Sequence, residues 1–366
     1  MVMMDSINSV LNWVVPPASL VMLAFSWPAL TLIKGCEWLY YSFVNEDMFN
    51  KVVVVTGASS GIGEQIAYEY AKKRANLVLV ARRDNRLHGI SENARRLGAP
   101  NVLIMAADVV KEEDCRRFVN ETIGYYGQID HLVNTASLGH TFYFDEANDA
   151  SVFPILMDIN FWGNVYPTYV ALPYLRQTHG RIVVNAAVEN WLPLPRMSIY
   201  SAAKAALVNF YETLRLELNG DVGITIATHG WIGAEMTRGK FMLEEGAEMQ
   251  WKEERELQAS GSPVEEFARL IVSAAVRGTE NVKFPSWYDV FLLYRVFAPD
   301  ILTWTFRLLL SRQGMRTTSF IGTGAPLLES PAPPKQSAIG SPQRFPRSPP
   351  QFPRSPPRVQ LKLIHE

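Results

Sequence analysis

The sequence predicts an α/β domain built on a doubly wound parallel sheet, and two observations support this prediction. Short runs rich in β-branched residues alternate along the chain with longer helical stretches. Each run is apolar throughout, as in strands that helices cover on both faces. The runs are Val52–Thr56, Leu77–Val80, Val102–Met105, Leu132–Asn134, Ile182–Asn185 and Ile224–Thr228.

The chain is longer than one such domain needs. It has 366 residues, against about 250 for a single doubly wound domain, so further segments lie at its ends. Changes in composition divide it into a hydrophobic segment over residues 1–46, the sheet domain over residues 47–283, hydrophobic helices over residues 284–324 and a proline-rich tail over residues 325–366.

The N-terminal segment predicts contact with a membrane. From Ser6 to Ile33 there are 28 residues without a charge, enough as a helix to cross a hydrocarbon layer about 30 Å thick. It lacks the charged start and the cleavage site of a secretory signal, so we expect it to be retained. Because Pro16, Pro17 and Pro28 interrupt it, a hairpin that enters and returns fits as well as a single span. A helix buried in the protein's own core is a third interpretation.

The C-terminal region contains two different segments. Phe284 to Leu310 is rich in Trp, Tyr, Phe and Leu, which is typical of core helices or of a second surface for a membrane or a dimer. Eleven of the 23 prolines follow Ala325, and such a density predicts a disordered tail or a docking site for a proline-binding module.

Composition excludes some classes of function. The chain has 35 Lys and Arg against 36 Asp and Glu, without a basic stripe, so we expect no nucleic-acid partner. Its cysteines, Cys36 and Cys115, form no cluster with each other or with histidines. This argues against a disulfide framework and against a metal site, and it favours a reducing compartment for the catalytic part.

A glycine-rich turn follows the first predicted strand and indicates a dinucleotide site of the Rossmann type. Gly57 allows a tight turn, Gly61 lets the backbone approach a pyrophosphate, and Gly63 permits close packing of helix on sheet. The start of the following helix offers free N–H groups and a positive dipole end. The residues expected to contact the cofactor here are Gly57, Ser59, Ser60, Gly61, Ile62 and Gly63.

The end of the second predicted strand favours NADP(H) over NAD(H). A free ribose 2′-hydroxyl calls for an acidic residue at this place, but the chain has Ala81 and Arg82 there. Arginine suits a 2′-phosphate because its planar donors carry charge. At the end of the third strand, Asp108 and Val109 are placed to meet the adenine ring.

A tyrosine and a lysine four residues apart provide the candidate acid–base pair. Tyr200 and Lys204 share one face of the helix that follows the fifth predicted strand. A phenol is a poor acid–base group at neutral pH unless a nearby cation stabilises its phenolate, and Lys204 can do so.

Together these motifs resemble the short-chain dehydrogenase/reductase family, over roughly residues 50–278. The matching motifs are TGASSGIG at residues 56–63, Asp108, NTA at residues 134–136, Asn160 and YSAAK at residues 200–204. The leader, the C-terminal extension and the sequence around Tyr200 are further similar to plant 11β-hydroxysteroid dehydrogenase-like proteins, the steroleosins of oil bodies. In that group a proline knob in the leader inserts into the lipid monolayer.

The resemblance implies roles for particular residues. Tyr200 donates or accepts the proton, Lys204 lowers its pKa and contacts the nicotinamide ribose, and Asn160 holds a water of a proton relay. Asn134 and Ile232 join the cofactor contacts, and a homodimer is expected.

Three features depart from the family pattern. The serine that orients the substrate oxygen, thirteen residues before the tyrosine, is Ala187 here. The Thr or Ser that binds the carboxamide is Ala234, and the Asn-Asn-Ala-Gly pattern reads Asn134-Thr-Ala-Ser137. Ser137 or Ser198 could replace the missing hydroxyl.

These observations leave two hypotheses about function. The first is an NADP(H)-dependent oxidoreductase that interconverts hydroxyl and keto groups on a steroid or sterol-like lipid. It would be anchored to the endoplasmic reticulum or to a lipid droplet, with its catalytic domain in the cytosol. The alternative is a catalytically silent NADP-binding structural protein of the lipid-droplet surface, which Ala187 and Ala234 keep in consideration.

Overall fold

The computed structural model describes residues 2–43, 45–59, 61–140, 143–147, 150–230, 241–242, 249–250 and 264–310. Ser60, Ile232, Ala234 and the proline-rich tail, for which the sequence gives expectations, lie outside the described residues.

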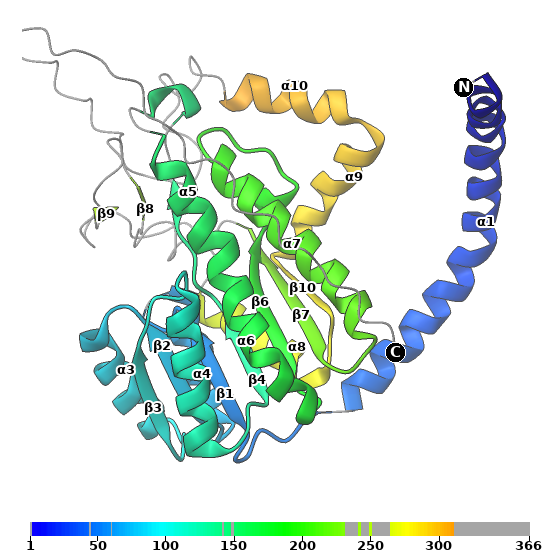
Figure 1. The fold of residues 1–366 in the computed structure, drawn as a ribbon. Coiled ribbons are helices and arrows are strands. Elements are labelled where there is room, and N and C mark those ends of the chain that lie inside the picture. The colour runs from blue at the N-terminus through cyan, green and yellow to red at the C-terminus, as the bar shows by residue number, and fades with distance from the viewer. Residues whose placement is uncertain are drawn as a thin grey trace, which may run out of the picture. The chain divides into compact units, whose positions relative to one another are not determined.

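A seven-stranded sheet in the order β10-β7-β6-β4-β1-β2-β3 forms the centre of the domain (Figure 1). Every neighbouring pair is parallel. The sheet is doubly wound, because the strand order reverses between β1 and β4. The strands are β1 Val52–Thr56, β2 Asn76–Ala81, β3 Val102–Ala106, β4 His131–Asn134, β6 Arg181–Ala187, β7 Gly223–His229 and β10 Asn281–Phe284. The six predicted strands are therefore confirmed.

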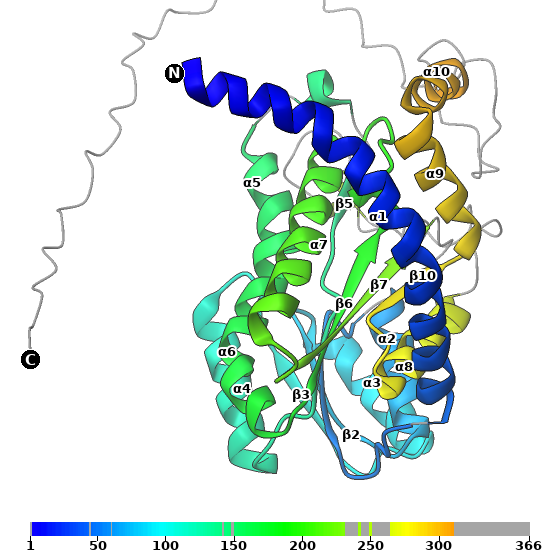
Figure 2. The same ribbon diagram turned by 90° about the vertical axis from the view of Figure 1, so that its right-hand side faces the viewer.

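Helices cover both faces of this sheet, as Figures 1 and 2 show. Val53 and Val55 of β1 join one core cluster, whereas Val52 and Val54 join the other. Because both sets are buried, the strand is apolar at every position. One face carries α2 Gly61–Lys72, α3 Asp84–Arg96 and α8 Val264–Arg277; the other carries α4 Glu112–Tyr126, α6 Gly163–Gln177 and α7 Ser198–Leu218.

Shorter elements connect the strands on the side of their carboxyl ends. The described part of the chain also forms a small sheet in the order β5-β8-β9. These elements are β5 Gly139–His140, η1 Phe144–Glu146, α5 Val152–Met157, the π-helical turn η2 Asp158–Trp162, the 3-10 turn η3 Val188–Asn190, β8 Phe241–Met242, β9 Met249–Gln250 and η4 Ser286–Tyr288.

The edge strand β10 is a feature that the sequence did not predict. Its residues alternate between exposed and half-buried, unlike the apolar runs of the central strands. An edge strand keeps one side open to solvent, so it lacks the continuous apolar pattern by which the other strands were found.

Two C-terminal helices, α9 Asp289–Phe297 and α10 Pro299–Leu310, follow β10. Leu302 of α10 packs with Val188 and Leu192, so the pair belongs partly to the core. Large apolar side chains of the same helices are nevertheless exposed: Val290, Leu293, Val296, Phe297, Ile301, Trp304 and Leu308.

The N-terminal segment forms a single helix, α1 Val2–Phe43, which continues through all three prolines. Its section Trp13–Ile33 has 21 residues with a mean hydropathy of 1.4 and none of it is buried in the protein. This length and composition are sufficient to cross a membrane. The sequence left three interpretations of this segment open. The structure shows a continuous helix, and the interpretation as a core helix is wrong.

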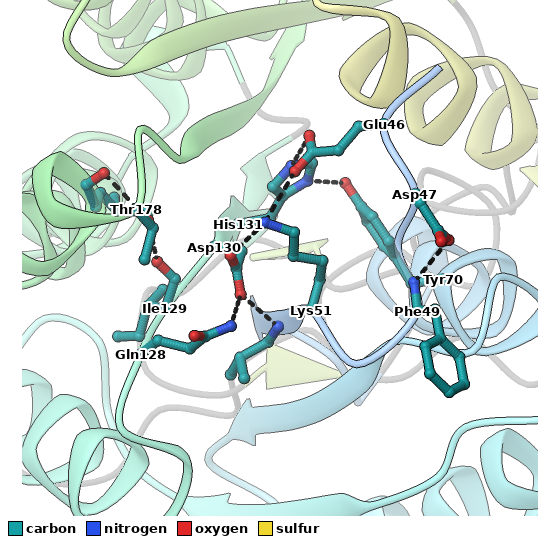
Figure 3. A network of polar contacts seen from close by, with 12 residues as sticks. Glu46, Asp47, Phe49, Lys51, Tyr70, Gln128, Ile129, Asp130, His131 and Thr178 are labelled. Carbon is teal, nitrogen blue, oxygen red and sulfur yellow. Dashed lines mark hydrogen bonds and ion pairs between the residues drawn. The ribbon is translucent and has the colours of Figure 1, made fainter.

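A partly buried polar network holds the chain where it enters the domain (Figure 3). The backbone N–H of Glu46 donates to the carbonyl of Val276 at 3.0 Å. The Glu46 carboxylate lies 3.1 Å from Nε2 of His131, and Nδ1 of the same ring lies 2.8 Å from the Tyr70 hydroxyl. Burial alone would raise the pKa of Glu46, but the hydrogen bond and charge of His131, with Lys51, hold it below its usual value.

Candidate active site

The glycine turn after β1 packs closely against the end of β4. Gly57 has a φ of +67°, and a Cβ at this position would lie 2.8 Å from the backbone nitrogen of Ala136. A Cβ on Gly63 would lie 2.6 Å from the carbonyl oxygen of Gly57. Only glycine fits at these two places, so the turn packs directly against the backbone around it.

A groove opens at the carboxyl ends of β1, β2, β3 and β4, beside this turn. Six of the predicted cofactor-binding residues line it, namely Gly57, Ser59, Ala81, Arg82, Asp108 and Val109. The groove is also lined by Arg83, Ala107, Ala136, Ser137, Leu138 and Ile159. A ligand crevice at the switch point of a doubly wound sheet is where a dinucleotide binds.

Arg83 is a groove residue for which the sequence gave no role. Its guanidinium donates to the Ser59 hydroxyl at 3.3 Å, which joins the end of β2 to the glycine turn. Burial lowers the pKa of Arg83, and the neighbouring charges of Arg86 and Arg82 lower it further. The groove therefore has a concentration of positive charge at this end. Its position directly after Arg82 was the only indication in the sequence.

Other predicted cofactor residues have different surroundings. Gly61 begins α2 with a φ of +56°, and Ile62 is fully buried in the core. The Asn134 amide donates to the carbonyl of Asn164 at 3.1 Å and to the Thr168 hydroxyl at 2.9 Å. Its side chain thus ties β4 to α6, and the residues that follow it, Ala136 to Leu138, line the groove instead.

The predicted acid–base pair lies at the start of α7. The Nζ atom of Lys204 is 5.6 Å from the centre of the Tyr200 ring. Lys204 is fully buried and donates to the carbonyl of Asn185 at 3.0 Å, whereas Tyr200 keeps 5 % of its surface exposed. A cation near a phenol favours the phenolate, which is the arrangement that an acid–base tyrosine needs.

Asn160 lies in the π-helical turn η2, and its side chain contacts two residues that line the groove. Its Oδ1 accepts from the Ser137 hydroxyl at 2.9 Å and from the backbone N–H of Leu138 at 3.0 Å. Its backbone carbonyl accepts from Asn164 Nδ2 at 3.0 Å. Single π turns of this kind are frequent at functional sites.

Ala187 stands where the family has its serine. It ends β6, pairs in register with His229 of β7, and packs with Met197 and Tyr200. The Ser137 hydroxyl is already bonded to Asn160, and Ser198 is exposed at the first position of α7. Neither serine is therefore placed by the structure as the missing hydroxyl.

A buried carboxyl group follows two residues later. Glu189 lies in η3 with 3 % of its surface exposed. Burial raises the pKa of Glu189 to about 7, although its own backbone N–H and the charge of Lys204 oppose the shift. Its Oε2 atom has no hydrogen-bond partner in the described part of the chain. No motif in the sequence pointed to Glu189, because its burial arises only from the tertiary fold.

These features fit a nicotinamide dinucleotide. Gly57 lines the groove, and the start of α2, which can bind a pyrophosphate, follows four residues later. Arg82 and Arg83 line the same groove and offer charge to a phosphate. Among the described residues, no group of three or more His, Cys, Asp and Glu could hold a metal ion.

A doubly wound sheet with this glycine turn and a Tyr/Lys pair defines a dinucleotide-dependent oxidoreductase. The model of the short chain dehydrogenase family matches residues 51–244. The chain belongs to this family, and it is an oxidoreductase.

Curated relatives match almost the whole chain. It is 74 % identical over 346 residues to an 11-beta-hydroxysteroid dehydrogenase B of Sesamum indicum, with 94 % of this chain and 96 % of the relative covered. It is 68 % identical over 347 residues to an 11-beta-hydroxysteroid dehydrogenase-like 5 protein of Arabidopsis thaliana, with 94 % and 89 % covered. The similarity to this plant group that the sequence indicated is confirmed.

Solved structures confirm the fold. A short chain dehydrogenase/reductase from Burkholderia phymatum in complex with NAD has a TM-score of 0.61 at 22 % identity, with 70 % of this chain and 96 % of that chain covered. An alcohol dehydrogenase from the archaeon Thermococcus sibiricus, in complex with 5-hydroxy-NADP, has a TM-score of 0.54 at 25 % identity, with 65 % and 97 % covered.

Proposed function

We propose that this protein is an NADP(H)-dependent dehydrogenase that interconverts a hydroxyl and a keto group on a steroid or sterol-like lipid. The observation that carries the proposal is the buried Lys204 beside Tyr200, next to a groove with Arg82 and Arg83 at one end. The substrate class is supported by the names of the plant relatives, which are hydroxysteroid dehydrogenases.

Tyr200 is the proton donor or acceptor of this reaction. In the reductive direction its O–H gives a proton to the oxygen of the former ketone, and in the oxidative direction its phenolate takes one from the hydroxyl. Lys204 stabilises the phenolate by its charge, and the carbonyl of Asn185 fixes the ammonium in place. When bound, the nicotinamide cofactor supplies or accepts the hydride.

The cofactor preference rests on two arginines. Arg82 and Arg83 both line the groove directly after β2, where NAD-dependent proteins of this fold carry an acidic residue. Their charges pair well with a ribose 2′-phosphate, whereas a free hydroxyl carries no charge to pair with. We therefore assign NADP(H) as the cofactor.

Ala187 also supports a second candidate function. Losing one preorganised donor to the reacting oxygen typically costs about a hundredfold in rate, or more. With no serine hydroxyl at this point, a dinucleotide-binding protein without turnover, serving at a lipid surface, is the competing function. The two differ in one property, which is turnover of a bound cofactor.

A screen of NADPH oxidation over keto-steroids, 11-keto steroids among them, tests the function. The enzyme is expected to consume NADPH in proportion to the hydroxysteroid that appears. If the purified protein binds NADPH tightly but oxidises it no faster with any steroid than without, the silent protein is the better description.

We also propose that α1 anchors the protein to a lipid surface, either the endoplasmic reticulum or a lipid droplet. Its section Trp13–Ile33 exposes an apolar surface along its whole length, and α9 and α10 expose a further set of apolar side chains. Burying so much apolar area far exceeds ordinary peripheral contact.

Deletion of residues 2–43 tests the anchor while leaving Glu46 and its contact with His131 in place. The shortened protein is expected to leave the membrane fraction and still bind NADPH. If it stays with the membrane, replacing Phe297 and Trp304 by serine shows whether the exposed face of α9 and α10 holds it.

A further inference from the structure

Without the serine hydroxyl, the reaction lacks one hydrogen-bond donor to the reacting oxygen. The oxygen of a ketone gains negative charge as hydride arrives at its carbon, and a second hydrogen-bond donor beside Tyr200 stabilises that charge. Ser137 is engaged with Asn160, and Ser198 is exposed at the start of α7. The role is therefore open to another donor.

Glu189 is a buried polar residue two positions beyond Ala187 along the chain. The turn η3 begins directly after Ala187 and is held to it, because the Asn190 amide donates to the Ala187 carbonyl at 2.7 Å. The backbone N–H groups of Trp191 and Leu192 close the turn on the carbonyl of Val188, at 3.1 and 2.8 Å. The position of Glu189 relative to Ala187 is thus fixed by the backbone.

The carboxyl group of Glu189 also has unused hydrogen-bonding capacity next to the acid–base pair. Its Oε2 atom is buried without a partner among the described residues, and the charge of Lys204 acts on it. Leaving a buried polar atom unsatisfied costs about 1–3 kcal/mol, so such an atom is expected to gain a partner when the site is filled. A carboxyl group in a buried place can remain protonated and donate a hydrogen bond to an oxyanion.

We propose that Glu189 is a catalytic residue of this enzyme, whose protonated carboxyl donates a hydrogen bond to the reacting oxygen in place of the serine hydroxyl. The inference rests on the proposed function. No proton is lost by Glu189 in the step: Tyr200 transfers its proton to the oxygen, and Glu189 keeps its own while its O–H stabilises the charge that develops.

The protonated form is available at neutral pH. Burial raises the pKa of Glu189 to about 7. The charge of Lys204 on α7 acts on both Glu189 and His229 of β7, and Tyr288 of η4 packs with Val188 and Leu192 on either side of Glu189. Burial lowers the pKa of His229 to about 4, so this ring stays neutral and competes with neither group.

A double-mutant cycle of Glu189→Leu and Ala187→Ser tests the proposal. Leucine removes the donor, so Glu189→Leu alone is expected to lower kcat by at least about tenfold. With Ala187→Ser present, the serine supplies the donor, and the same Glu189→Leu change should alter kcat by less than about twofold. Glu189→Gln keeps an N–H donor and is expected to retain most of the turnover.

NADPH binding, followed by fluorescence, reports that each variant is folded, and Glu189→Ala takes the place of any leucine variant that fails to bind.

The outcomes distinguish a failure of the role proposed for Glu189 from a failure of the proposed function. If turnover is measurable but Glu189→Leu has the same effect with and without Ala187→Ser, Glu189 is not the replacement donor while the proposed function stands. If neither the natural protein nor its Ala187→Ser variant oxidises NADPH with any keto-steroid, the proposed function is wrong, and this inference fails with it.

Discussion

Arg83 donates a hydrogen bond to the hydroxyl of Ser59 across 3.3 Å, so the end of β2 is tied to the glycine turn after β1. Arg82, its neighbour, lines the same groove. We therefore expect different effects from the two arginines, because Arg83 also supports the turn in which a pyrophosphate would lie.

This difference predicts distinct effects of the two alanine substitutions. Arg82→Ala should weaken NADPH binding about ten- to a hundredfold and leave NADH binding nearly unchanged, because a charge-assisted contact is worth roughly 1.5–3 kcal/mol. Arg83→Ala should weaken the binding of both cofactors, since both use the glycine turn. Fluorescence titration measures each dissociation constant, with Arg96→Ala on the exposed side of α3 as control. Equal losses of both cofactors in Arg82→Ala would remove the case for NADP(H).

The buried chain of Glu46, His131 and Tyr70 predicts a stability effect far from the active site. Tyr70→Phe removes the hydroxyl that lies 2.8 Å from Nδ1 of His131 and leaves a buried ring nitrogen without a partner. The free energy of unfolding should fall by about 1–3 kcal/mol. Denaturation with urea measures it, and Tyr125→Phe, whose side chain is exposed, should change it little. Equal stability of the two variants would mean that the network does not hold the junction.

Glu189 predicts a dependence of stability on pH. Burial raises the pKa of its carboxyl from 4.5 to about 7, so the folded protein binds this proton more tightly than the unfolded chain does. The stabilising contribution is complete below the unfolded pKa and is lost as the pH rises through about 7. A shift of this size corresponds to at most about 3 kcal/mol.

Glu189→Gln removes this titration. The variant should therefore gain stability relative to the natural protein as the pH rises from about 5 to about 8. Urea unfolding at both pH values gives the comparison, and Glu212→Gln, at an exposed position of α7, is the control. A constant difference between the two proteins at both pH values would show that Glu189 does not titrate with folding.

The sequence predicted those parts of the fold that depend on local pattern. Central strands buried on both faces leave continuous apolar runs, so Val52–Thr56 and its companions were found, whereas the half-exposed strand Asn281–Phe284 was not. Gly57 and Gly63 were predicted correctly because their backbone geometry permits no other residue.

The sequence could not predict the residues whose importance comes from tertiary packing. Arg83 reaches the glycine turn only because β1 and β2 lie side by side. Glu189 looks in the sequence like any surface carboxylate, and its burial depends on the packing of η3 against α7 and on the end of β6. Asn134 was expected at the cofactor, and the sequence did not predict that its side-chain amide donates to Thr168 of α6 and Tyr211 of α7.

The most direct test of the proposed oxidoreductase is the steady-state oxidation of NADPH by the full-length protein with a keto-steroid, beside its Tyr200→Phe variant. Phenylalanine removes the proton donor and leaves the ring that lies 5.6 Å from Lys204. The variant should therefore lose about a hundred- to ten-thousandfold in kcat and keep the NADPH affinity of the natural protein. Turnover that survives Tyr200→Phe, or a natural protein that binds NADPH and oxidises it with no steroid, would contradict the assignment of Tyr200 as the acid–base group of an active dehydrogenase.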